Sequence, residues 1–422
     1  MGRFNRKLEE IASDSKMLKK KLYVCITPFF PDKDAVYGSY IYDQIKAISR
    51  NSEFKVVVLR PKPLLNKAES YEYDGIRVLL FPALFMPSYF FNGLTNPYNK
   101  RAFISSLKLH GIDIGDIGIV HCHTASFACF GIAIKKINPH AKVLLQHHDP
   151  DPYQIVNGKF AGFLPNLLYR TAVNMSNFKK IDCHICISKF VEKNLLSFPN
   201  IDSNIVYEPY INKLKKIGSA KFSTSGFKTY VLYNGVDTDI FKPLSINKSN
   251  DAFTIGCIAN YIDWKDQITL LKATNLISQK GQIPNLKVKL IGHGPLEESL
   301  HQYVINHNLE GIVQFNDEID HSKLPDFYNS LDLFVLPSYF EGFGCVYTEA
   351  AACGVPFIMC KGQGASEYIP ASEAEKWLID KGDFESLANK IYNYYLYRYN
   401  QILSKTFNIN ELIKEYLRAI IY

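Results

Sequence analysis

Short apolar runs alternate with longer amphipathic stretches along the first half of the chain. The runs are rich in β-branched residues and read KLYVCITPF, FKVVVLRP, GIRVLLFP, GIVHCHT and KVLLQHH, and GSYIYDQIKAISRN is an amphipathic stretch between the first two. Alternating strands and helices form βαβ units, which build a parallel sheet with helices on both faces. The pattern predicts one α/β domain that continues through HICISKFVEKNLL to TYVLYNGVDTDIFKP.

A second series of the same kind begins at FTIGCIANY. Its predicted helices are DQITLLKATNLISQ and PLEESLHQYVINHN, and its further predicted strands are LKVKLIGHG, VQFND, LDLFVLPS and GVPFIMC. Residues 244–251 (LSINKSND) separate the two series and are polar and without periodicity, which is typical of a linker. We therefore expect a second doubly wound domain.

The length of the chain agrees with two domains, because 422 residues exceed the size that one ordinary hydrophobic core supports. We predict one Rossmann-like domain over residues 1–243, a second over 244–395, and a C-terminal helix over 396–422 that packs back on the first domain. Ligands in open α/β sheets bind at the carboxyl ends of the strands. We expect the two domains to face each other across a cleft at those ends.

Composition narrows the class of protein and of ligand. Hydrophobic residues make up 47% and charged residues 21%, which excludes a disordered chain. Lysine plus arginine exceed aspartate plus glutamate by 48 − 41 = +7, and no basic run resembles a nucleic-acid arm. We therefore expect anionic ligands or lipid head groups as partners and no nucleic acid.

The N-terminus and the cysteines indicate a reducing compartment. The first twenty residues contain no apolar run long enough for a signal peptide, which predicts a cytoplasmic protein. Nine cysteines are scattered through apolar segments, as expected for buried thiols outside a disulfide framework. Cys183 and Cys186 form a pair that a metal or redox site would use, but IDCHICIS alternates like a strand and no second pair has ligand spacing.

Residues 78–99 are uncharged and long enough to span a bilayer, yet Pro82, Pro87 and Pro97 interrupt them. A transmembrane helix is therefore not expected. The simpler interpretation is a loop packed under a lid. The alternative is a contact with a membrane surface or a lipid-linked molecule, made by Phe85, Met86, Tyr89, Phe90 and Phe91.

The segment most informative about chemistry begins at Pro337 and reads PSYFEGFGCVYTEAAACGVPF. The preceding strand ends at Pro337, and Gly342 and Gly344 permit a tight loop whose backbone can approach a ligand closely. A helix is predicted to begin near Gly344 and to stop before Gly354. The free N–H groups and the positive dipole end of such a helix favour a phosphate or diphosphate.

Two glutamates bracket this predicted anion site. Glu341 comes just before the helix and Glu349 lies inside it, at most about 12 Å of helical rise away. One carboxylate can accept hydrogen bonds from sugar hydroxyls, while the other accepts from a ribose diol. The alternative is two solvated side chains, but the setting of this Glu-x7-Glu pattern in a βα unit makes it specific.

This segment resembles the retaining GT-B glycosyltransferases of family 4, and the resemblance extends over nearly the whole chain. YNGVD with Phe241 and Pro243 is similar to the interdomain signature of that family, and GASEYI is similar to its late G-x-x-E segment. The resemblance implies a GT-B fold with an acceptor-side first domain and a second domain that binds a nucleotide-sugar donor. It implies no metal and no cofactor besides that donor.

The resemblance also assigns site residues. Lys265 in IANYIDWKDQ would bind the donor diphosphate, and Asn260 stands where the family commonly has arginine. Gly38 belongs to the phosphate-facing loop of TPFFPDKDAVYGSYIYDQ, where a glycine pair is commoner. The remaining donor contacts are assigned to Gly292 and Gly294 of IGHGPLEESL and to Gly342, Phe343, Gly344, Cys345 and Glu349.

Histidines follow two strands of the first series, in HCHTAS and LLQHHDPDP, which places His123 and His147 or His148 at the cleft edge. Either His147 or His148 is similar to the family histidine near the transferred sugar, and we favour His148. The acidic triplets at 149–151 and 237–239 are also found in metal-dependent enzymes of another fold, but such short matches arise easily by chance.

The predicted reaction moves a sugar from a UDP- or GDP-sugar to an acceptor hydroxyl with retention of configuration. We expect Glu341 to orient the sugar, Glu349 the ribose and Lys265 the diphosphate. The acceptor would be a glycan or lipid-linked glycan in cell-surface polysaccharide or glycoconjugate synthesis, with peripheral contact to the inner face of the membrane. The alternatives are another GT-B enzyme, such as a nucleotide-sugar epimerase or a disaccharide phosphorylase, and a non-catalytic donor-binding subunit.

Overall fold

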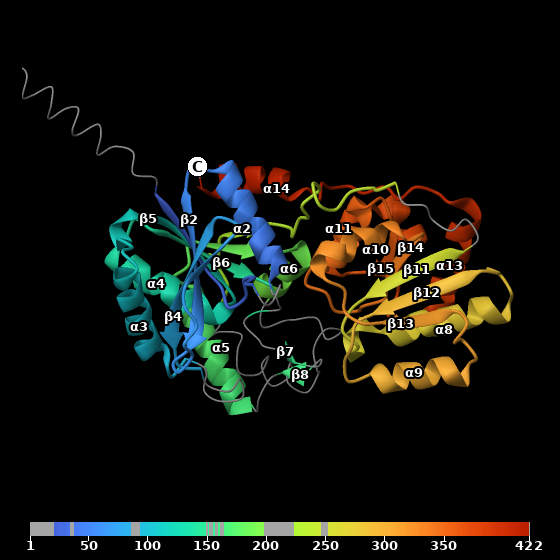
Figure 1. The fold of residues 1–422 in the computed structure, drawn as a ribbon. Coiled ribbons are helices and arrows are strands. Elements are labelled where there is room, and N and C mark those ends of the chain that lie inside the picture. Colours follow the sequence, from blue (N-terminus) through green and yellow to red (C-terminus); the bar gives the residue numbers. More distant parts are fainter. Residues whose placement is uncertain are drawn as a thin grey trace, which may run out of the picture. The chain divides into compact units, whose positions relative to one another are not determined.

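The computed structural model describes residues 21–33, 38–85, 93–148, 151, 155–156, 159–160, 164–197, 223–245 and 252–421 (Figure 1). The described residues fall into two compact units. Unit 1 contains the residues up to Gln146 together with Val173–His184, and unit 2 contains His147–Ala172 and the chain from Ile185 onward. The domain boundaries at 243 and 395 stay a prediction.

The first sheet has eight strands in the order β10-β9-β6-β5-β1-β2-β4-β3. Its strands are β1 (Leu22–Ile26), β2 (Lys55–Pro63), β3 (Tyr71–Tyr73), β4 (Ile76–Ala83), β5 (Ile117–His123), β6 (Lys142–His147), β9 (Cys183–Cys186) and β10 (Thr229–Val231). The pairs of β1 with β2 and β5, of β2 with β4 and of β5 with β6 are parallel, and β3 runs antiparallel to β4. The five apolar runs at the start of the chain are thus strands of one sheet, as their pattern predicts.

Helices connect these strands. They are α2 (Ser39–Asn51), α3 (Asn96–Leu109), α4 (Ala128–Ile137), α5 (Leu164–Phe178) and α6 (Lys189–Leu196), and a short hairpin is formed by β7 (Ile155–Val156) and β8 (Lys159–Phe160). Gly131 lets α4 lie close to the sheet, because a Cβ there would be 2.6 Å from a methyl carbon of Val143. The rings of Phe103 and Phe130 pack α3 against α4 with centroids 4.9 Å apart.

The second sheet lies in unit 2 and has six strands in the order β13-β12-β11-β14-β15-β16, all parallel. They are β11 (Phe253–Ile258), β12 (Leu286–Ile291), β13 (Val313–Asn316), β14 (Leu333–Leu336), β15 (Phe357–Cys360) and β16 (Leu378–Ile379). In chain order this is 3-2-1-4-5-6, the order of a Rossmann sheet. The predicted second doubly wound domain is therefore present as a sheet of this type.

Helices cover both faces of the second sheet, with α8 and α9 on one side and α10 and α11 on the other (Figure 1). The helices of this part are α8 (Gln267–Gln279), α9 (Glu297–Asn306), α10 (Leu324–Asn329), α11 (Cys345–Ala352), α12 (Ala374–Trp377), α13 (Phe384–Tyr397) and α14 (Ile409–Tyr416). The core between them is aliphatic and aromatic, with Tyr328, Tyr347 and Trp377 fully buried.

The C-terminal helix α14 contacts the segment YNGVD within unit 2. Val236 pairs with Asn408 in a parallel bridge, and Asn408 Nδ2 donates a hydrogen bond to Thr238 Oγ1 at 2.7 Å. A Cβ on Gly235 would lie 2.7 Å from Cα of Ile409, so only glycine permits this approach. None of the helices in the described part of the chain is long and apolar enough to cross a membrane.

Candidate functional site

The strand order of the second sheet reverses between β11 and β14, which pair directly while β12 and β15 lie on their outer sides. Ligands in open α/β sheets bind beside the carboxyl ends of the two strands at such a point. The loop after β11 carries Asn260 and Lys265, and the loop after β14 carries Glu341. These three of the residues assigned to the donor thus lie on the two loops at the switch point of unit 2.

Hydrogen bonds tie these two loops to each other. The Ser338 hydroxyl and the Tyr339 amide both donate to the carbonyl of Trp264, at 2.8 and 3.0 Å. Further along the same two loops, Lys265 Nζ donates to Glu341 Oε1 at 2.5 Å, and the two side chains are 20% and 10% exposed. Since an ammonium has three N–H donors, Lys265 can keep Glu341 and contact a phosphate oxygen as well.

Gln363 holds Glu341 from the other side. The Glu341 amide donates to Gln363 Oε1 at 2.8 Å, and the Gly364 amide donates to the Glu341 carbonyl at 3.2 Å. Gln363 is buried, so its amide is available for little else. Sequence reasoning did not single out Gln363, and its one signal is its place directly before the segment GASEYI.

The helix α11 begins where the sequence predicts. Gly344 is its N-cap at φ 86°, no side chain caps the helix, and the first backbone bond runs from the Tyr347 amide to the Gly344 carbonyl. The first turn of α11 therefore presents the positive end of the helix dipole, which favours an anion. Cys345 lies at this end and its sulfur accepts a hydrogen bond from Asn234 Nδ2 at 3.7 Å, which joins YNGVD to the helix.

Gly342 and Phe343 pack against other protein segments. A Cβ on Gly342 would lie 2.4 Å from the carbonyl oxygen of His148, and a Cβ on Gly364 would lie 2.2 Å from the Gly342 carbonyl oxygen. The Phe343 ring is buried against Tyr368 with centroids 5.7 Å apart. The space beside Gly342 is thus filled by other segments, and the Phe343 ring is used in packing. The backbone is the part of Phe343 that a ligand would meet.

Glu349 is partly buried on α11 and accepts a hydrogen bond from Tyr328 of α10. The Tyr328 hydroxyl lies 2.8 Å from Glu349 Oε2, and Tyr328 itself is fully buried. Burial raises the pKa of Glu349 to about 7, although the hydrogen bond from Tyr328 favours the carboxylate. Glu349 therefore titrates near neutral pH, and Tyr328 fixes one of its two oxygens.

The structure separates the two neighbouring histidines. His147 is completely buried, and its Nδ1 lies 2.8 Å from Asp151 Oδ2. Burial lowers the pKa of His147 to about 3 and raises the pKa of Asp151 to about 8, so the neutral forms of both groups are favoured. His148 is partly exposed. Its pKa is lowered to about 3, mainly by burial and to a lesser extent by the nearby His147. His148 is thus the member of the pair with access to solvent, and both imidazoles are neutral at pH 7.

His123 lies in the core of unit 1, away from solvent. It is fully buried and its ring stacks on His121 with centroids 4.6 Å apart. The Tyr23 hydroxyl lies 2.6 Å from Nδ1 of His121. His123 is thus a buried residue at the carboxyl end of β5, and its place at the edge of a cleft between the domains stays a prediction.

Gly292 and Gly294 support the loop after β11. Their φ angles are 138° and 155°, and a Cβ would lie 2.2 Å from the Ala259 carbonyl oxygen at Gly292 and 2.6 Å from that of Tyr261 at Gly294. Between these two contact points, the side chain of Asn260 is exposed and makes no hydrogen bond to any residue that the structure describes. The glycines thus hold the backbone around an amide that is available to a ligand.

Gly38 has a comparable place in unit 1. It is the N-cap of α2 in the left-handed conformation, φ 80°, and a Cβ there would lie 2.9 Å from the backbone of Phe29. It follows β1, which pairs with both β2 and β5 at the point where the order of the first sheet reverses. The four residues before Gly38 lie outside the described residues.

Glu367 has a role that sequence reasoning missed. Its carboxylate accepts hydrogen bonds from the amides of Lys189 and Phe190, at 3.1 and 2.8 Å, and from the Tyr233 hydroxyl at 2.8 Å. The first two donors are the opening amides of α6, so Glu367 neutralises the positive end of that helix. The signal in the sequence is the G-x-x-E pattern of GASEYI, which gives the residue but not its partners.

Among the described residues, no three histidine, cysteine or acidic side chains converge as the ligands of a metal ion would. Asp237 instead accepts a hydrogen bond from the Asp239 amide at 3.0 Å, and its carbonyl accepts the amides of Ile240 and Phe241. Residues 149 and 150 lie outside the described residues. Asp151 is the carboxyl partner of His147.

Two family models match the chain on either side of its middle. Residues 38–207 match the model "Glycosyltransferase Family 4", and residues 239–398 match "Glycosyl transferases group 1". The chain belongs to glycosyltransferase family 4. This confirms the resemblance inferred from the Glu-x7-Glu segment, and the switch point of the second sheet, between β11 and β14, falls within the second matched range.

Relatives and solved structures agree with this family. The chain is 31% identical over 196 residues to the capsular polysaccharide biosynthesis glycosyltransferase CapM of Staphylococcus aureus. The matched segment covers 45% of this chain and 47% of CapM. The matched segments span between 32 and 47% of the length of the first curated relatives. The fold is similar to sucrose-phosphate synthase from Thermosynechococcus elongatus, at a TM-score of 0.62, 19% identity and 95% coverage of both chains.

Another similar structure is that of Anabaena HepE in complex with UDP and glucose, at a TM-score of 0.60, 18% identity and 94% coverage of both chains. Likeness at this level of identity concerns the fold. Together with the two largely parallel sheets, it confirms the predicted α/β class and the GT-B fold.

Proposed function

We propose that this family 4 protein transfers a sugar from a nucleoside-diphosphate sugar to an acceptor hydroxyl, with retention of the anomeric configuration. The observation that carries the proposal is the Lys265–Glu341 pair, held beside the open N-terminus of α11 at the switch point of a Rossmann sheet. A cation, the backbone amides of a helix N-terminus and a carboxylate that accepts from sugar hydroxyls are the groups that such a donor requires.

Each part of the donor has a residue suited to it. The diphosphate would take an N–H of Lys265 that Glu341 does not accept, together with backbone amides in the first turn of α11, and the exposed amide of Asn260 can donate to the same oxygens. Glu341 would accept hydrogen bonds from sugar hydroxyls while it stays paired with Lys265. Glu349 would accept from the ribose diol through the oxygen that Tyr328 does not hold.

The transfer needs no protein nucleophile. The bond between the anomeric carbon and the phosphate oxygen breaks, the acceptor oxygen bonds to the same carbon on the same face, and the acceptor proton moves to the departing phosphate. The phosphate leaves as an anion, so the main demand on the protein is charge stabilisation by Lys265 and the helix terminus. His148, partly exposed and neutral, would contact the transferred sugar as a hydrogen-bonding group rather than as a cation.

The donor and the acceptor are proposed at the level of class. A UDP- or GDP-sugar is the proposed donor, and UDP and glucose occupy the structure of HepE, whose fold is similar. The proposed acceptor is a glycan or a lipid-linked glycan, in line with the polysaccharide role in the name of CapM. Contact with a membrane remains part of this proposal, and Phe85, 54% exposed, is the one residue of the aromatic segment within the described part of the chain.

A thermal-shift screen against UDP-, GDP- and ADP-sugars tests donor binding. A ligand at a hundred times its dissociation constant stabilises the folded state by about 2.7 kcal/mol, so one nucleotide class should raise the melting temperature. No shift with any of them would reject the proposal. Release of free nucleoside diphosphate only when an acceptor is present identifies transfer, whereas turnover of the donor alone would indicate an epimerase.

A further inference from the structure

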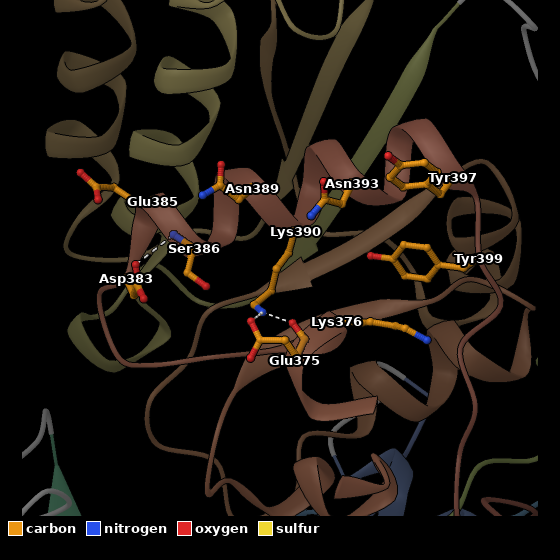
Figure 2. Close-up of a pocket in the computed structure, with 10 residues that line it drawn as sticks. All are labelled: Glu375, Lys376, Asp383, Glu385, Ser386, Asn389, Lys390, Asn393, Tyr397 and Tyr399. Carbon is orange, nitrogen blue, oxygen red and sulfur yellow. Dashed lines mark hydrogen bonds and ion pairs between the residues drawn. The ribbon is translucent and has the colours of Figure 1, made fainter. Parts of the chain in front are cut away.

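A groove of about 560 Å³ lies between α12 and α13 in unit 2 (Figure 2). This volume is within the range of small-ligand sites. The residues that line it all carry a polar atom in the side chain, and none belongs to the candidate donor site. They are Glu375, Lys376, Asp383, Glu385, Ser386, Asn389, Lys390, Asn393, Tyr397 and Tyr399.

The helix α13 supplies one polar face to this groove. Ser386, Asn389, Asn393 and Tyr397 follow one another at intervals of three or four residues, so they lie along one side of the helix. The opposite side is apolar and buried, and it includes Leu387, Ala388 and Ile391. The buried side holds α13 against the core. The outer face of the helix therefore presents a row of polar side chains about one helical turn apart.

The two amides in this row are available to a ligand. Asn389 and Asn393 are exposed, and neither side chain makes a hydrogen bond to a residue within the described ranges. Each amide offers two N–H donors and one carbonyl acceptor. Because they are one helical turn apart, they can contact successive polar groups of one extended molecule.

Lys390 forms the floor of the groove. Its side chain is 7% exposed, and its ammonium donates to the backbone carbonyl of Glu375 and lies 3.4 Å from Glu375 Oε1 (Figure 2). These contacts use two of the three N–H donors of an ammonium. A buried cation with a remaining donor is a strong hydrogen-bonding group for an oxygen of a ligand.

The charges of the lining disfavour an anionic ligand. Lys390 is paired with Glu375, and Lys376 is paired with Glu373 at 3.0 Å. Among the lining residues three carboxylates face two ammonium groups, a net charge of 2 − 3 = −1. A phosphate or a uronate would therefore meet repulsion at the rim.

Two tyrosines lie at the same end of the groove (Figure 2). Tyr397 is 71% exposed, while Tyr399 packs on Trp377 with ring centroids 5.1 Å apart. An exposed tyrosine offers an apolar ring face and a hydroxyl, which match the C–H face and the hydroxyls of a pyranose. A peptide would require apolar anchor pockets or an open strand edge, and this lining has neither.

We propose that the groove between α12 and α13 binds a neutral oligosaccharide, at a site separate from the donor site. Asn389 and Asn393 contact hydroxyls of successive sugar units, Lys390 donates to an oxygen at the floor, and Tyr397 stacks on the last unit. The proposal does not depend on the identity of the donor. It gives the protein a second hold on a glycan chain, outside the place where the chain is extended.

Calorimetry with defined oligosaccharides tests this proposal. The full chain is titrated with the pentamers of cellulose, amylose, chitin and mannan, each up to about 10 mM, and with a galacturonic acid pentamer as the anionic comparison. At least one neutral pentamer is expected to bind with a millimolar or lower dissociation constant. Asn389→Ala with Asn393→Ala should weaken that binding about tenfold, through the loss of two polar contacts.

Three further variants make the test specific. Tyr397→Ala should weaken binding while Tyr397→Phe keeps most of it, because the ring provides the stacking. Gln279→Ala removes an exposed amide at the end of α8 and should bind as the wild type does. Tyr397 is exposed, so its variants report on the groove even where the asparagine variants melt early. Binding of UDP, where the wild type binds it, should be unchanged in all of them, which separates this test from that of the donor site.

The proposal is overturned by any of three results. The first is that no neutral pentamer binds. The second is that binding is equal in the wild type, the double asparagine variant and Tyr397→Ala. The third is that the galacturonic acid pentamer binds more tightly than every neutral one.

Discussion

At the scale of single residues, the candidate donor site rests on an ion pair that is mostly removed from solvent. Lys265 and Glu341 are 20% and 10% exposed. Removal of either side chain would therefore leave the charge of the other unpaired where the solvent screens it poorly. A surface pair such as Lys361 with Asp380, 50% and 69% exposed, lacks this dependence.

Lys265→Ala and Glu341→Ala should each lower turnover about a hundredfold or more, because each removes one charge-stabilising or orienting contact with the donor. Steady-state kinetics with the donor found in the thermal-shift screen measures the effect. Lys361→Ala also removes a lysine from an ion pair and should leave turnover unchanged. Activity within twofold of wild type in both site variants would reject the assignment.

If Glu349 binds the ribose as proposed, nucleotide binding should be sensitive to pH. Its pKa is raised to about 7 by burial, and only the carboxylate can accept hydrogen bonds from both hydroxyls of a diol. The affinity for the nucleotide should therefore reach its full value above about pH 7 and fall as the pH drops below it. The other titratable groups beside the Tyr328–Glu349 pair are Cys345 and Cys353, and burial raises the pKa of Cys353 to about 12.

Tyr328→Phe should move this pH profile upward. The hydrogen bond from Tyr328 lowers the pKa of Glu349, so its loss raises that pKa further and weakens nucleotide affinity several-fold at pH 7. Calorimetric titration with the nucleoside diphosphate from pH 6 to about pH 9 measures the midpoint. Tyr347→Phe is the matched control, since its buried hydroxyl bonds to the Leu336 carbonyl. Identical midpoints in both variants would contradict the role of Tyr328.

At the scale of elements, glycines bring chain segments together around the loop after β14. A Cβ at Gly342 would lie 2.4 Å from the His148 carbonyl oxygen. The segments that carry Gly342 and His148 would have to move apart to make room for a larger side chain. Gly311, by contrast, has open space around it and no positive φ angle.

Gly342→Ala should lower the free energy of unfolding by about 1–3 kcal/mol, the usual cost of forcing a methyl group into a packed site. It should also lower turnover, because the same loop carries Glu341. Gly311→Ala should leave both quantities within error of the wild type. Urea denaturation and steady-state kinetics make the comparison, and equal stability of the two variants would show that the loop yields without cost.

Glu367 connects the segment Gly364–Tyr368 to the first turn of α6. Glu367→Ala removes a carboxylate that accepts three hydrogen bonds, two of them from backbone amides at a helix N-terminus. We expect the free energy of unfolding to fall by about 1–3 kcal/mol, measured by urea denaturation. Glu310→Ala, at an exposed position, should have no effect. A loss of stability that is equal in both variants would contradict the capping role.

At the scale of the whole molecule, the sequence was sufficient to predict the strands and the fold class. The apolar runs such as FKVVVLRP and LDLFVLPS are continuous because parallel strands are covered on both faces, and that pattern is local. The helix after Gly344 was also predictable, since a glycine start and a Gly354 stop frame it. Lys265 and Glu341 were identified one at a time, each from its own motif.

The partners of these residues were not predictable, because they depend on distant segments. Gln363, Tyr328 and Asp151 contact predicted site residues, but no motif in the sequence pairs them with those residues. The burial of His123 also depends on packing from both sides of its strand. Periodicity gives the face of a strand, whereas the number of layers above that face is a property of the folded unit.

The 3-2-1-4-5-6 order of the second sheet also has a consequence for folding. Ile255 of β11 pairs with Leu333 of β14 in the centre of the sheet. Two other strands, β12 and β13, lie between these partners in the sequence and are synthesised before β14. Loop closure of that kind is entropically expensive and slow to form. During synthesis β11, β12 and β13 can associate early, but the two loops that carry Lys265 and Glu341 meet only after β14 has emerged. The candidate donor site thus cannot form before β14 joins the sheet, and a chain stopped before β14 would lack it entirely.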